Sequence, residues 1–430
     1  MIGESLIKEL YYREASNSPI KIAIAGAGFL GRGLINQISL MKGIRVSAIA
    51  NRNPEKALTA LSQAKLPYRH RLCRGQEDLR RALLSGETGV VDDPLLLAAA
   101  DVDIILDCTG SVEVGASLGL AAIEQGKHFI TNAEADATVG FVLNKKAREK
   151  GLVYSGVDGD EPGVAMRLYR YVSLLGLDIV AAGKFKKFYD RFATPESIRP
   201  WAERYRQNPF MIASFTDGTK LSFEMTQLSN ATGLVPEVRG MNCPRATLDT
   251  VAEVLRLREQ GGILNYKGVV EVVQDVEPSG GVFVVASTSH PDIMQYLHYL
   301  KMGDGPNYLF YRPYHLCTIE MPATIIIAAL SGEATIAPQG MPVAETLAVA
   351  KRDLLPGEVL DGIGRYTFYG LIDKARTVRE EKLLPAGLAQ GARVLRPIKR
   401  DQPISLDDVE VNYDSDLWKL RKQQESLFPL

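Results

Sequence analysis

Residues 21–33 read KIAIAGAGFLGRG, an apolar run that breaks into glycines at positions 26, 28 and 31 and then into a helical pattern. The run Ile22–Ala25 predicts a buried parallel strand. In such a strand, turn and helix, Gly26 makes the tight turn, Gly28 lets a pyrophosphate approach the backbone, and Gly31 lets the helix pack closely on the sheet. The helix N-terminus would then face the phosphates. The predicted dinucleotide contacts in this turn are Gly26, Gly28, Phe29, Leu30 and Gly31.

The end of the second predicted strand, Val46–Ala50, indicates which dinucleotide is bound. This strand follows at the spacing of a βαβ unit and runs directly into Asn51 and Arg52. A site for NAD usually offers Asp or Glu to the ribose hydroxyls here. Asn51 can instead hydrogen-bond a 2′-phosphate without repelling it, and the Arg52 guanidinium can pair with that phosphate. We therefore predict NADP(H), with the alternative that Arg52 is a solvated turn residue.

Length, composition and charge predict a water-soluble protein of two or three domains. The chain has 430 residues, of which 46% are hydrophobic and 23% charged, and its formal net charge is -1. That charge argues against nucleic acid as the main partner. The 4 cysteines form no Cys-x-x-Cys pair, and no run approaches the roughly 18 apolar residues of a membrane span. Since residues 1–17 mix charges and lack an apolar signal core, we expect a cytoplasmic protein that does not enter a membrane.

Strand and helix patterns alternate up to about residue 155, which predicts an α/β fold with an N-terminal doubly wound Rossmann domain. The predicted strands are 22–25, 46–50, 103–107, 128–131 and 152–155, and helices are predicted at 114–125 and 137–150. Between residues 66 and 100 the pattern loosens. We interpret this stretch as an insertion before the fourth main strand.

The pattern changes after Pro162, where β-prone runs are mixed with helices. The β-prone runs are 178–188, 219–226 and 281–287, and a helix is predicted at 246–260. These features predict a central α+β domain for substrate binding and dimerisation. The last hundred residues are short segments between Pro-Gly and Gly turns, typical of a small β-rich module. The predicted domains are 1–160, 161–340 and 341–430.

Polar residues follow two predicted strands at the carboxyl edge of the sheet, where ligands bind in doubly wound folds. Thr109 and Gly110 follow the strand that ends at Asp107, and we predict that they line the nicotinamide. Asn132 follows the next strand and can orient the nicotinamide amide or the substrate. Cys108 has no histidine beside it in the sequence and is interpreted as a small buried residue.

Glu134 stands two residues after Asn132 and has two interpretations. It is a candidate acid, base or metal-organising carboxylate. The alternative is that this segment is only a helix N-terminus. In that segment we predict Asp136 as the capping residue of a helix that opens at Ala137.

The most concentrated acidic cluster is Asp158, Asp160 and Glu161, on a glycine-containing turn after a strand. Three carboxylates so close together repel one another unless a cation neutralises them, and hard divalent ions prefer oxygen ligands. The cluster therefore predicts a Mg²⁺ or Mn²⁺ site. The alternative is that Asp160 or Glu161 caps the helix that opens at Pro162 while the others face water.

Basic residues in two further segments could meet an anionic substrate. Lys184 and Lys186 share one face of a predicted strand. Arg312 offers paired donors for phosphate or carboxylate, and His315 can move a proton. An amphipathic edge strand and aromatic packing are the respective alternatives. The predicted catalytic residues are Glu134, Lys184, Lys186, Arg312 and His315.

Taken together, these motifs resemble one family of bacterial oxidoreductases, which have a homoserine-dehydrogenase-like NAD(P) domain and a C-terminal SAF domain. The segments that carry the resemblance are 26–33, 107–110, 132–136, 157–163, 311–315 and the C-terminal Pro-Gly turns. Within that family the chain is most similar to the enzymes that resemble deoxyxylulose phosphate reductoisomerase. In the ordinary reductoisomerase a Val-Asp-Ser-Glu run holds the divalent ion. Here residues 157–160 resemble that run, but Gly159 and Asp160 stand in place of its Ser and Glu.

The resemblance implies an NADPH- and metal-dependent enzyme that converts deoxyxylulose phosphate to methylerythritol phosphate, acting as a homodimer or higher homo-oligomer on a phosphorylated or polyhydroxy small molecule. Two alternatives stay open. One is an NAD(P)-dependent dehydrogenase of another polyol, a sugar acid or a homoserine-like substrate, although the Asn-Lys of homoserine dehydrogenases is here Asn132-Ala133. The other is a dinucleotide-sensing or sugar-binding module without catalytic activity.

Overall fold

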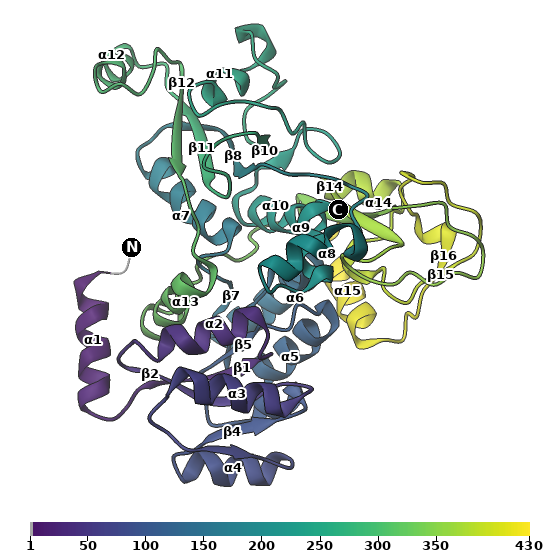
Figure 1. The fold of residues 1–430 in the computed structure, drawn as a ribbon. Helices are drawn as coiled ribbons and strands as arrows, with labels where there is room; N and C mark the ends of the chain where they lie inside the picture. Colours follow the sequence, from purple (N-terminus) through teal and green to yellow (C-terminus); the bar gives the residue numbers. More distant parts are fainter. Residues whose placement is uncertain (1–2) are drawn as a thin grey trace. The chain divides into compact units, whose positions relative to one another are not determined.

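The computed structural model describes residues 3–430 (Figure 1), and its contacts group the chain into two compact units. The first unit contains the chain up to Asp160, together with Leu316–Ala337 and Lys419–Gln424. The second contains Glu161–His315, Pro338–Trp418 and Glu425–Leu430. Whether residues 1–160, 161–340 and 341–430 behave as three domains stays a prediction.

The first unit is built on a parallel sheet of 7 strands in the order β3-β4-β2-β1-β5-β6-β7. This confirms the predicted α/β fold with a doubly wound sheet. The strands are β1 Ile20–Ala25, β2 Ile44–Ala50, β3 His70–Leu72, β4 Thr88–Val91, β5 Ile104–Asp107, β6 His128–Thr131 and β7 Tyr154–Gly156. The helices are α1 Glu4–Ala15, α2 Phe29–Ile38, α3 Pro54–Ala64, α4 Gln76–Leu84, η1 Pro94–Ala99, α5 Val112–Glu124, α6 Ala133–Glu149 and α13 Cys317–Ser331.

The core of this unit lies between the sheet and its helices. Ile22 and Ile24 of β1 are fully buried, as a central parallel strand requires. Helix α13 joins the same core from far along the sequence and packs against α2. The two helices approach closely at Gly33, where an added Cβ would lie 2.6 Å from Cγ2 of Thr318. The first unit therefore takes part of its core from residues beyond 315.

The stretch 66–100 differs from its interpretation as an insertion. Strands β3 and β4 pair in parallel, and β4 pairs with β2, so the stretch extends the main sheet. These strands have only 3 and 4 residues, which is too short for a clear apolar period.

The second unit has a mixed sheet of 5 strands in the order β12-β11-β8-β10-β9. The strands are β8 Asp178–Lys186, β9 Val235–Pro236, β10 Val269–Gln274, β11 Val282–Ser287 and β12 Asn307–Arg312. The helices are α7 Glu161–Leu174, α8 Pro195–Arg204, α9 Pro209–Thr216, α10 Thr219–Thr232, α11 Val251–Val254, η2 Arg258–Gln260 and α12 Pro291–Tyr299. Helix α7 packs against β8, β11 and β12. Phe185 points into an apolar core with Val251 and Leu255, so Lys184 belongs to the opposite face of β8.

Two predictions in this unit are wrong. Residues 219–226 form the buried helix α10 instead of a β-prone run, because Leu221, Phe223 and Met225 alternate with polar residues that are themselves buried. Those polar residues are hydrogen-bonded: the Ser222 hydroxyl, for example, donates to the backbone oxygen of Gly370 at 3.0 Å. A helix buried on all sides does not show the period of an amphipathic one. The helix predicted at 246–260 is reduced to α11 and the short η2.

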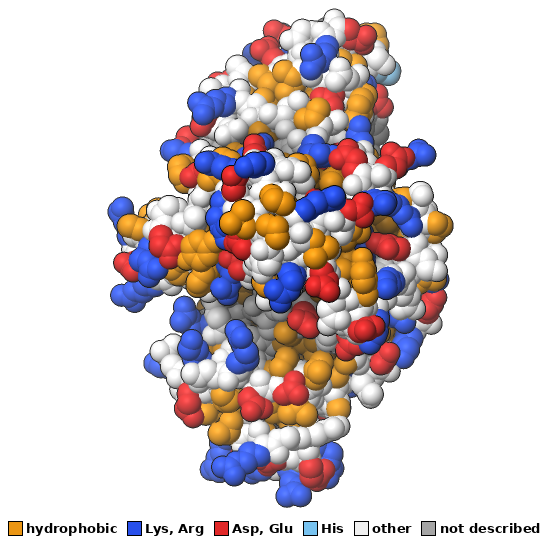
Figure 2. Space-filling model, turned by 90° about the vertical axis from the view of Figure 1, so that its right-hand side faces the viewer, with side chains coloured by type: hydrophobic (Ala, Val, Ile, Leu, Met, Phe, Trp, Pro, Cys, Tyr) orange, Lys and Arg blue, Asp and Glu red, His pale blue; other side chains and the backbone are white. Residues whose placement is uncertain are grey.

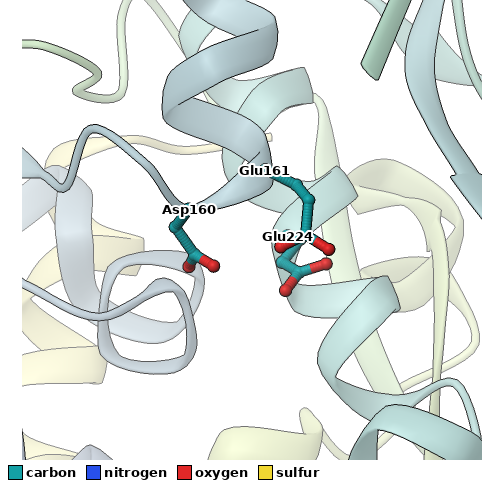
Figure 3. Close-up of side chains that lie close together, drawn as sticks. All are labelled: Asp160, Glu161 and Glu224. Carbon is teal, nitrogen blue, oxygen red and sulfur yellow. The ribbon is translucent and has the colours of Figure 1, made fainter. Parts of the chain in front are cut away.

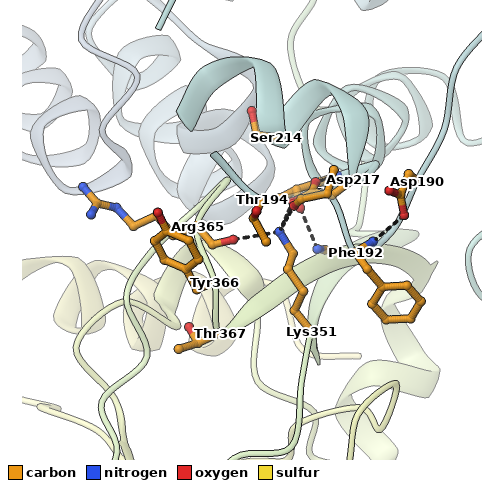
Figure 4. A network of polar contacts seen from close by, with 12 residues as sticks. Asp190, Phe192, Thr194, Ser214, Asp217, Lys351, Arg365, Tyr366 and Thr367 are labelled. Carbon is orange, nitrogen blue, oxygen red and sulfur yellow. Dashed lines mark hydrogen bonds and ion pairs between the residues drawn. The ribbon is translucent and has the colours of Figure 1, made fainter. Parts of the chain in front are cut away.

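The chain from residue 341 onward contributes small antiparallel sheets to the second unit. Its elements are β13 Ala344–Ala350, β14 Phe368–Lys374, α14 Ala375–Glu380, η3 Ala386–Leu388, β15 Arg393–Val394, η4 Leu406–Asp408, β16 Val409–Glu410 and α15 Asp416–Leu427. Just after β13, the buried ammonium group of Lys351 donates to Asp217 Oδ2 at 2.7 Å and to the backbone oxygens of Ala193 and Arg365 (Figure 4). All three of its N–H groups are thereby used. The predicted likeness to a SAF domain stays a prediction.

The surface carries charges of both signs. On the face that Figure 2 shows, Lys and Arg side chains lie among Asp and Glu side chains without a large field of one sign. Within residues 3–430 no helix is both long enough and apolar enough to cross a membrane.

Candidate active site

The glycine turn of the first unit has the geometry of a phosphate cradle. Gly26 has a φ of 101°, and a Cβ there would lie 2.7 Å from the Cys108 oxygen. A Cβ on Gly31 would lie 1.9 Å from the Gly26 oxygen, so both positions exclude any side chain. A Cβ on Gly28, in contrast, would have no heavy atom within 4 Å. This open space at the N-terminus of α2 fits the pyrophosphate of a dinucleotide.

The two residues predicted to select NADP differ in their availability. Asn51 ties the loops together, since its Oδ1 accepts the Ala27 N–H at 3.0 Å and its Nδ2 donates to the Asn53 oxygen at 2.6 Å. Arg52 is exposed. Recognition of a 2′-phosphate would therefore depend on Arg52 and stays a prediction.

At the carboxyl edge of β5 and β6, Asp107 joins the residues predicted to line the nicotinamide. Its Oδ1 accepts the backbone N–H of Thr109 at 2.9 Å and the Thr109 hydroxyl at 2.6 Å, and its Oδ2 accepts Nδ2 of Asn132 at 2.7 Å. Burial raises the pKa of Asp107 to about 6, although the bonds from Thr109 favour the charged form. Sequence reasoning placed Asp107 at this edge without assigning it a role. Gly110, with a φ of 68°, has open space above it.

Helix α6 begins earlier than predicted. Its N-cap is Asn132, whose Oδ1 accepts the Ala135 N–H at 2.8 Å, and its first residue is Ala133. Asp136 therefore lies inside the first turn and is not the cap. Glu134, also in the first turn, is buried. Its predicted role as acid or base stays a prediction.

The second unit contains a buried ion cluster around Lys184. The Lys184 ammonium group donates to Glu161 Oε1 and to Glu224 Oε2, the latter at 2.6 Å. These carboxylates come from α7 and α10 and point toward each other (Figure 3). The exposed fraction is 5% for the Lys184 side chain and 2% for that of Glu224, so water does not screen the pair.

Two further basic side chains lie near these carboxylates. Lys220 lies 3.1 Å from Glu224 Oε1, and His315 Nε2 lies 3.6 Å from Glu161 Oε2. Because the Gly280 carbonyl 2.6 Å away can only accept, His315 Nδ1 must carry the proton of that hydrogen bond. Nε2 is then the ring atom that faces Glu161.

The pKa values reflect this pairing. Burial alone would raise the pKa of Glu161, but the attraction of Lys184 and His315 holds it well below its ordinary value. Burial alone would lower the pKa of Lys184, yet the two carboxylates raise it. Both groups are therefore charged over a wide pH range.

The other predicted basic residues have different surroundings. Lys186 donates to the Phe215 oxygen at 2.8 Å, and burial together with repulsion from Lys184 lowers its pKa to about 8. The Arg312 guanidinium lies 4.4 Å from the centre of the Tyr314 ring. Val282 of β11 pairs with both Lys184 of β8 and Arg312 of β12, so Arg312 and Lys184 lie on the same face of the sheet, and the role of Arg312 as an anion ligand stays a prediction.

Of the three predicted metal ligands, Asp160 and Glu161 lie together, because a carboxylate oxygen of each lies within 4.8 Å of the other and of an oxygen of Glu224 (Figure 3), whereas Asp158 is not part of this group. Asp158 is buried in the first unit, where its N–H donates to the Thr324 hydroxyl at 2.8 Å. Asp160 is the last residue of that unit, and Glu161 is the first of the second unit, where Lys184 supplies its counter-charge. Sequence reasoning missed Glu224, because it lies in a stretch with no acidic neighbours. The Lys220–Glu224 spacing on α10 was the available signal.

Two protein families match adjacent parts of the chain. Residues 26–154 match the family described as "Homoserine dehydrogenase, NAD binding domain", and residues 159–321 match "Oxidoreductase DRL, catalytic domain". The second match contains Glu161, Lys184, Glu224 and His315. No curated protein matches the chain.

Solved structures resemble the chain only distantly. A probable dehydrogenase from Thermotoga maritima has a TM-score of 0.41 and 12% identity, covering 73% of this chain and 90% of its own. The myo-inositol dehydrogenase of Lactobacillus casei has a TM-score of 0.35 and 13% identity, covering 70% and 68%. UDP-N-acetylglucosamine 3-dehydrogenase from Acidithiobacillus ferrooxidans has a TM-score of 0.39 and 11% identity, and the match covers 74% of this chain and 92% of that one. Such low values decide nothing about substrate.

The parallel sheet, the glycine cradle and the two family matches define the class of this protein. It is an oxidoreductase with a Rossmann domain that binds a nicotinamide dinucleotide. The NAD-binding part resembles that of homoserine dehydrogenases, and the part from residue 159 to 321 resembles the DRL catalytic domain.

Proposed function

We propose that this chain is an NADP(H)-dependent dehydrogenase that interconverts a hydroxyl and a carbonyl group on a small polyhydroxy substrate. The nicotinamide ring supplies or accepts the hydride. The chain's own residues bind the substrate oxygen, stabilise its charge and move its proton. The observation that carries the proposal is the buried ammonium group of Lys184 between two carboxylates, inside the segment that matches an oxidoreductase catalytic domain.

Lys184 is suited to charge stabilisation at the reacting oxygen. Two of its three N–H groups are held by Glu161 and Glu224, which fixes the direction of the third. A fixed cation in a buried site stabilises a developing oxyanion far better than one in water, because the surroundings need not reorganise. Its raised pKa keeps the group charged, so it binds the oxygen without giving up its proton.

Proton transfer then falls to a different group. Histidine is the residue that most often transfers protons in enzymes. The hydrogen bond from His315 Nδ1 to the Gly280 carbonyl oxygen fixes the orientation of the imidazole ring. Lys186, with a pKa of about 8, is close enough to neutrality to exchange a proton as well. Because Glu161 has a low pKa, we assign it the orientation of Lys184 and His315 and not the role of base.

A second candidate is the metal-dependent reductoisomerase reaction on deoxyxylulose phosphate. It is favoured by the match to the DRL catalytic domain and by the facing carboxylates of Glu161 and Glu224. A divalent ion on these carboxylates would have to displace the Lys184 ammonium group, which already pairs with both of them. For this reason we place the dehydrogenase first.

One set of assays separates these functions. The protein is incubated with NADPH or NADP⁺ and a panel of polyols, sugar acids, hydroxyketones and deoxyxylulose phosphate, with EDTA or with Mn²⁺, and nicotinamide absorbance is followed. The dehydrogenase proposal expects turnover of a polyhydroxy substrate in EDTA. Methylerythritol phosphate formed only with Mn²⁺ would establish the reductoisomerase instead. Dinucleotide binding without any turnover would favour the non-catalytic module.

A matched pair of variants tests the assigned centre. Lys184→Met removes the buried cation, whereas Lys187→Met removes the exposed lysine that follows β8 and pairs with Glu277. We expect the first to abolish turnover and the second to leave it unchanged. Equal activity of the two variants would contradict the role of Lys184.

A further inference from the structure

We propose that Asp107 is a positioning residue for the nicotinamide half of the bound dinucleotide. Its carboxylate holds the loop after β5 and the start of α6 in the arrangement that receives this half. The inference rests on the dinucleotide-binding domain and needs none of the roles proposed for Lys184 or His315.

The hydrogen bonds of Asp107 connect two loops. One oxygen accepts both donors of Thr109, and the other accepts Nδ2 of Asn132. The remaining amide atom of Asn132 caps α6 through the Ala135 N–H. The carboxylate is thus the link between the residues after β5 and the N-terminus of α6.

This link lies at the part of the sheet where the nicotinamide half binds. The strand order reverses between β1 and β5, and a dinucleotide lies across that reversal. The half formed by β1 and β2 carries the phosphate cradle and the adenosine side, which leaves β5 and β6 for the nicotinamide. The Thr109 nitrogen would lie 3.2 Å from a Cβ on Gly26, so the loop after β5 packs directly on the cradle.

The polarity of the link explains why position 107 must be an ionised acid. The Thr109 and Asn132 nitrogens can only donate, so both oxygens of Asp107 must accept. Helix α5 comes close enough to enclose the carboxylate only because position 115 is glycine, where a Cβ would lie 2.6 Å from Asp107 Oδ2.

The titratable groups around Asp107 include no cation among the described residues. Cys108 follows Asp107 in the chain, Glu134 and Asp136 belong to α6, and Tyr154 belongs to β7. In the described part of the chain, the negative charge of Asp107 is therefore stabilised only by hydrogen bonds from the uncharged donors of Thr109 and Asn132.

A polarity swap tests the link. Asp107→Asn places an amide N–H₂ opposite the N–H₂ of Asn132, so two donors face each other. Adding Asn132→Asp to the same chain restores one donor facing one acceptor, and an aspartate caps a helix as well as an asparagine does. We expect the single variant to weaken NADPH binding, measured by fluorescence titration, about tenfold or more, and the double variant to recover most of that loss.

A second ligand separates positioning from general damage. 2′-phospho-ADP-ribose contains the adenosine half and the pyrophosphate but no nicotinamide, so its affinity should change less than about twofold in both variants. Asp103→Asn is the matched control, because Asp103 is exposed, lies just before β5 and accepts the backbone N–H of Lys21 in β1. Thr109→Val, at an exposed position, removes one donor and should weaken NADPH binding severalfold even if Asp107→Asn fails to fold.

Three outcomes would overturn the inference: unchanged NADPH affinity in Asp107→Asn, no recovery in the double variant, or equal losses for both ligands. A wild-type chain that binds 2′-phospho-ADP-ribose and no NADPH would also contradict it. Failure of the wild-type chain to bind either ligand would instead overturn the NADP(H) part of the proposed function.

Discussion

Asp107 and Glu161 are both buried carboxylates at predicted ligand sites, yet their pKa values shift in opposite directions. Asp107 is surrounded by neutral donors, and burial raises its pKa to about 6. Glu161 is paired with Lys184 and approached by His315, which hold its pKa well below the ordinary value. The difference shows that a buried acid is made permanently anionic by a neighbouring cation, whereas hydrogen bonds alone leave it able to take up a proton near neutral pH.

The largest expected effect comes from removing the cation that distinguishes the two acids. Lys184→Met leaves Glu161 and Glu224 buried without their main counter-charge, so we expect kcat/KM to fall about 10³-fold or more. The free energy of unfolding should also fall by about 3–5 kcal/mol, because an unpaired buried charge is costly. Steady-state kinetics and denaturant titration measure the two effects. Activity within tenfold of wild type would remove Lys184 from the mechanism.

The second prediction concerns pH and stability at Asp107. Between its ordinary pKa of 3.8 and the native value of about 6, the native state holds a proton that the unfolded state has lost. The contribution of Asp107 to stability therefore decreases as the pH rises through this window, by about 3 kcal/mol in all. Urea titrations between pH 4 and 7 should show Asp107→Asn gaining stability relative to wild type as the pH rises. A constant difference between the two proteins would contradict the raised pKa.

The third prediction weakens the ion cluster without removing its cation. Glu224→Gln keeps the shape of the side chain but leaves Lys184 with the single carboxylate of Glu161. We expect kcat to fall roughly 10- to 100-fold, because the ammonium group is less firmly oriented. Its Glu161 partner keeps it charged. Kinetics at saturating substrate would reveal this, with Lys187→Met as the control.

The smallest effect is expected at the adenosine end of the dinucleotide, where neither buried acid is involved. Arg52→Asp replaces an exposed cation by an anion that repels a 2′-phosphate. The ratio of kcat/KM with NADPH to that with NADH should fall about tenfold or more, which corresponds to about 1.4 kcal/mol. Preference of the unaltered protein for NADH would show that Arg52 is a solvated turn residue.

The nucleotide-binding end of the fold could be predicted because its signals are local. A glycine turn between β1 and α2 is dictated by a few adjacent residues, and the structure places Gly26 and Gly31 in contacts that allow no side chain. Helix α10 was not recognisable, because its polar residues are buried against distant backbone, as Ser222 is against Gly370.

The candidate site was only partly predictable for the same reason. Lys184 and His315 were identified by residue type and by the strand pattern. Glu224, the second partner of Lys184, comes from a helix 40 residues further along the chain, and no periodicity marks it. Asp107 was visible at the end of its strand, but the donors that surround it depend on how β5 and β6 pair. Long-range pairing is the information that a single sequence does not display.

The position of helix α13 late in the sequence affects how this protein folds during its synthesis on the ribosome. Met321 and Ile325 complete the apolar core that α2 and β1 begin some 300 residues earlier in the chain. Domains generally fold during synthesis, the N-terminal one first. Here part of the core of the nucleotide-binding unit stays uncovered until Glu161–His315, the first segment of the second unit, and then α13 have been made.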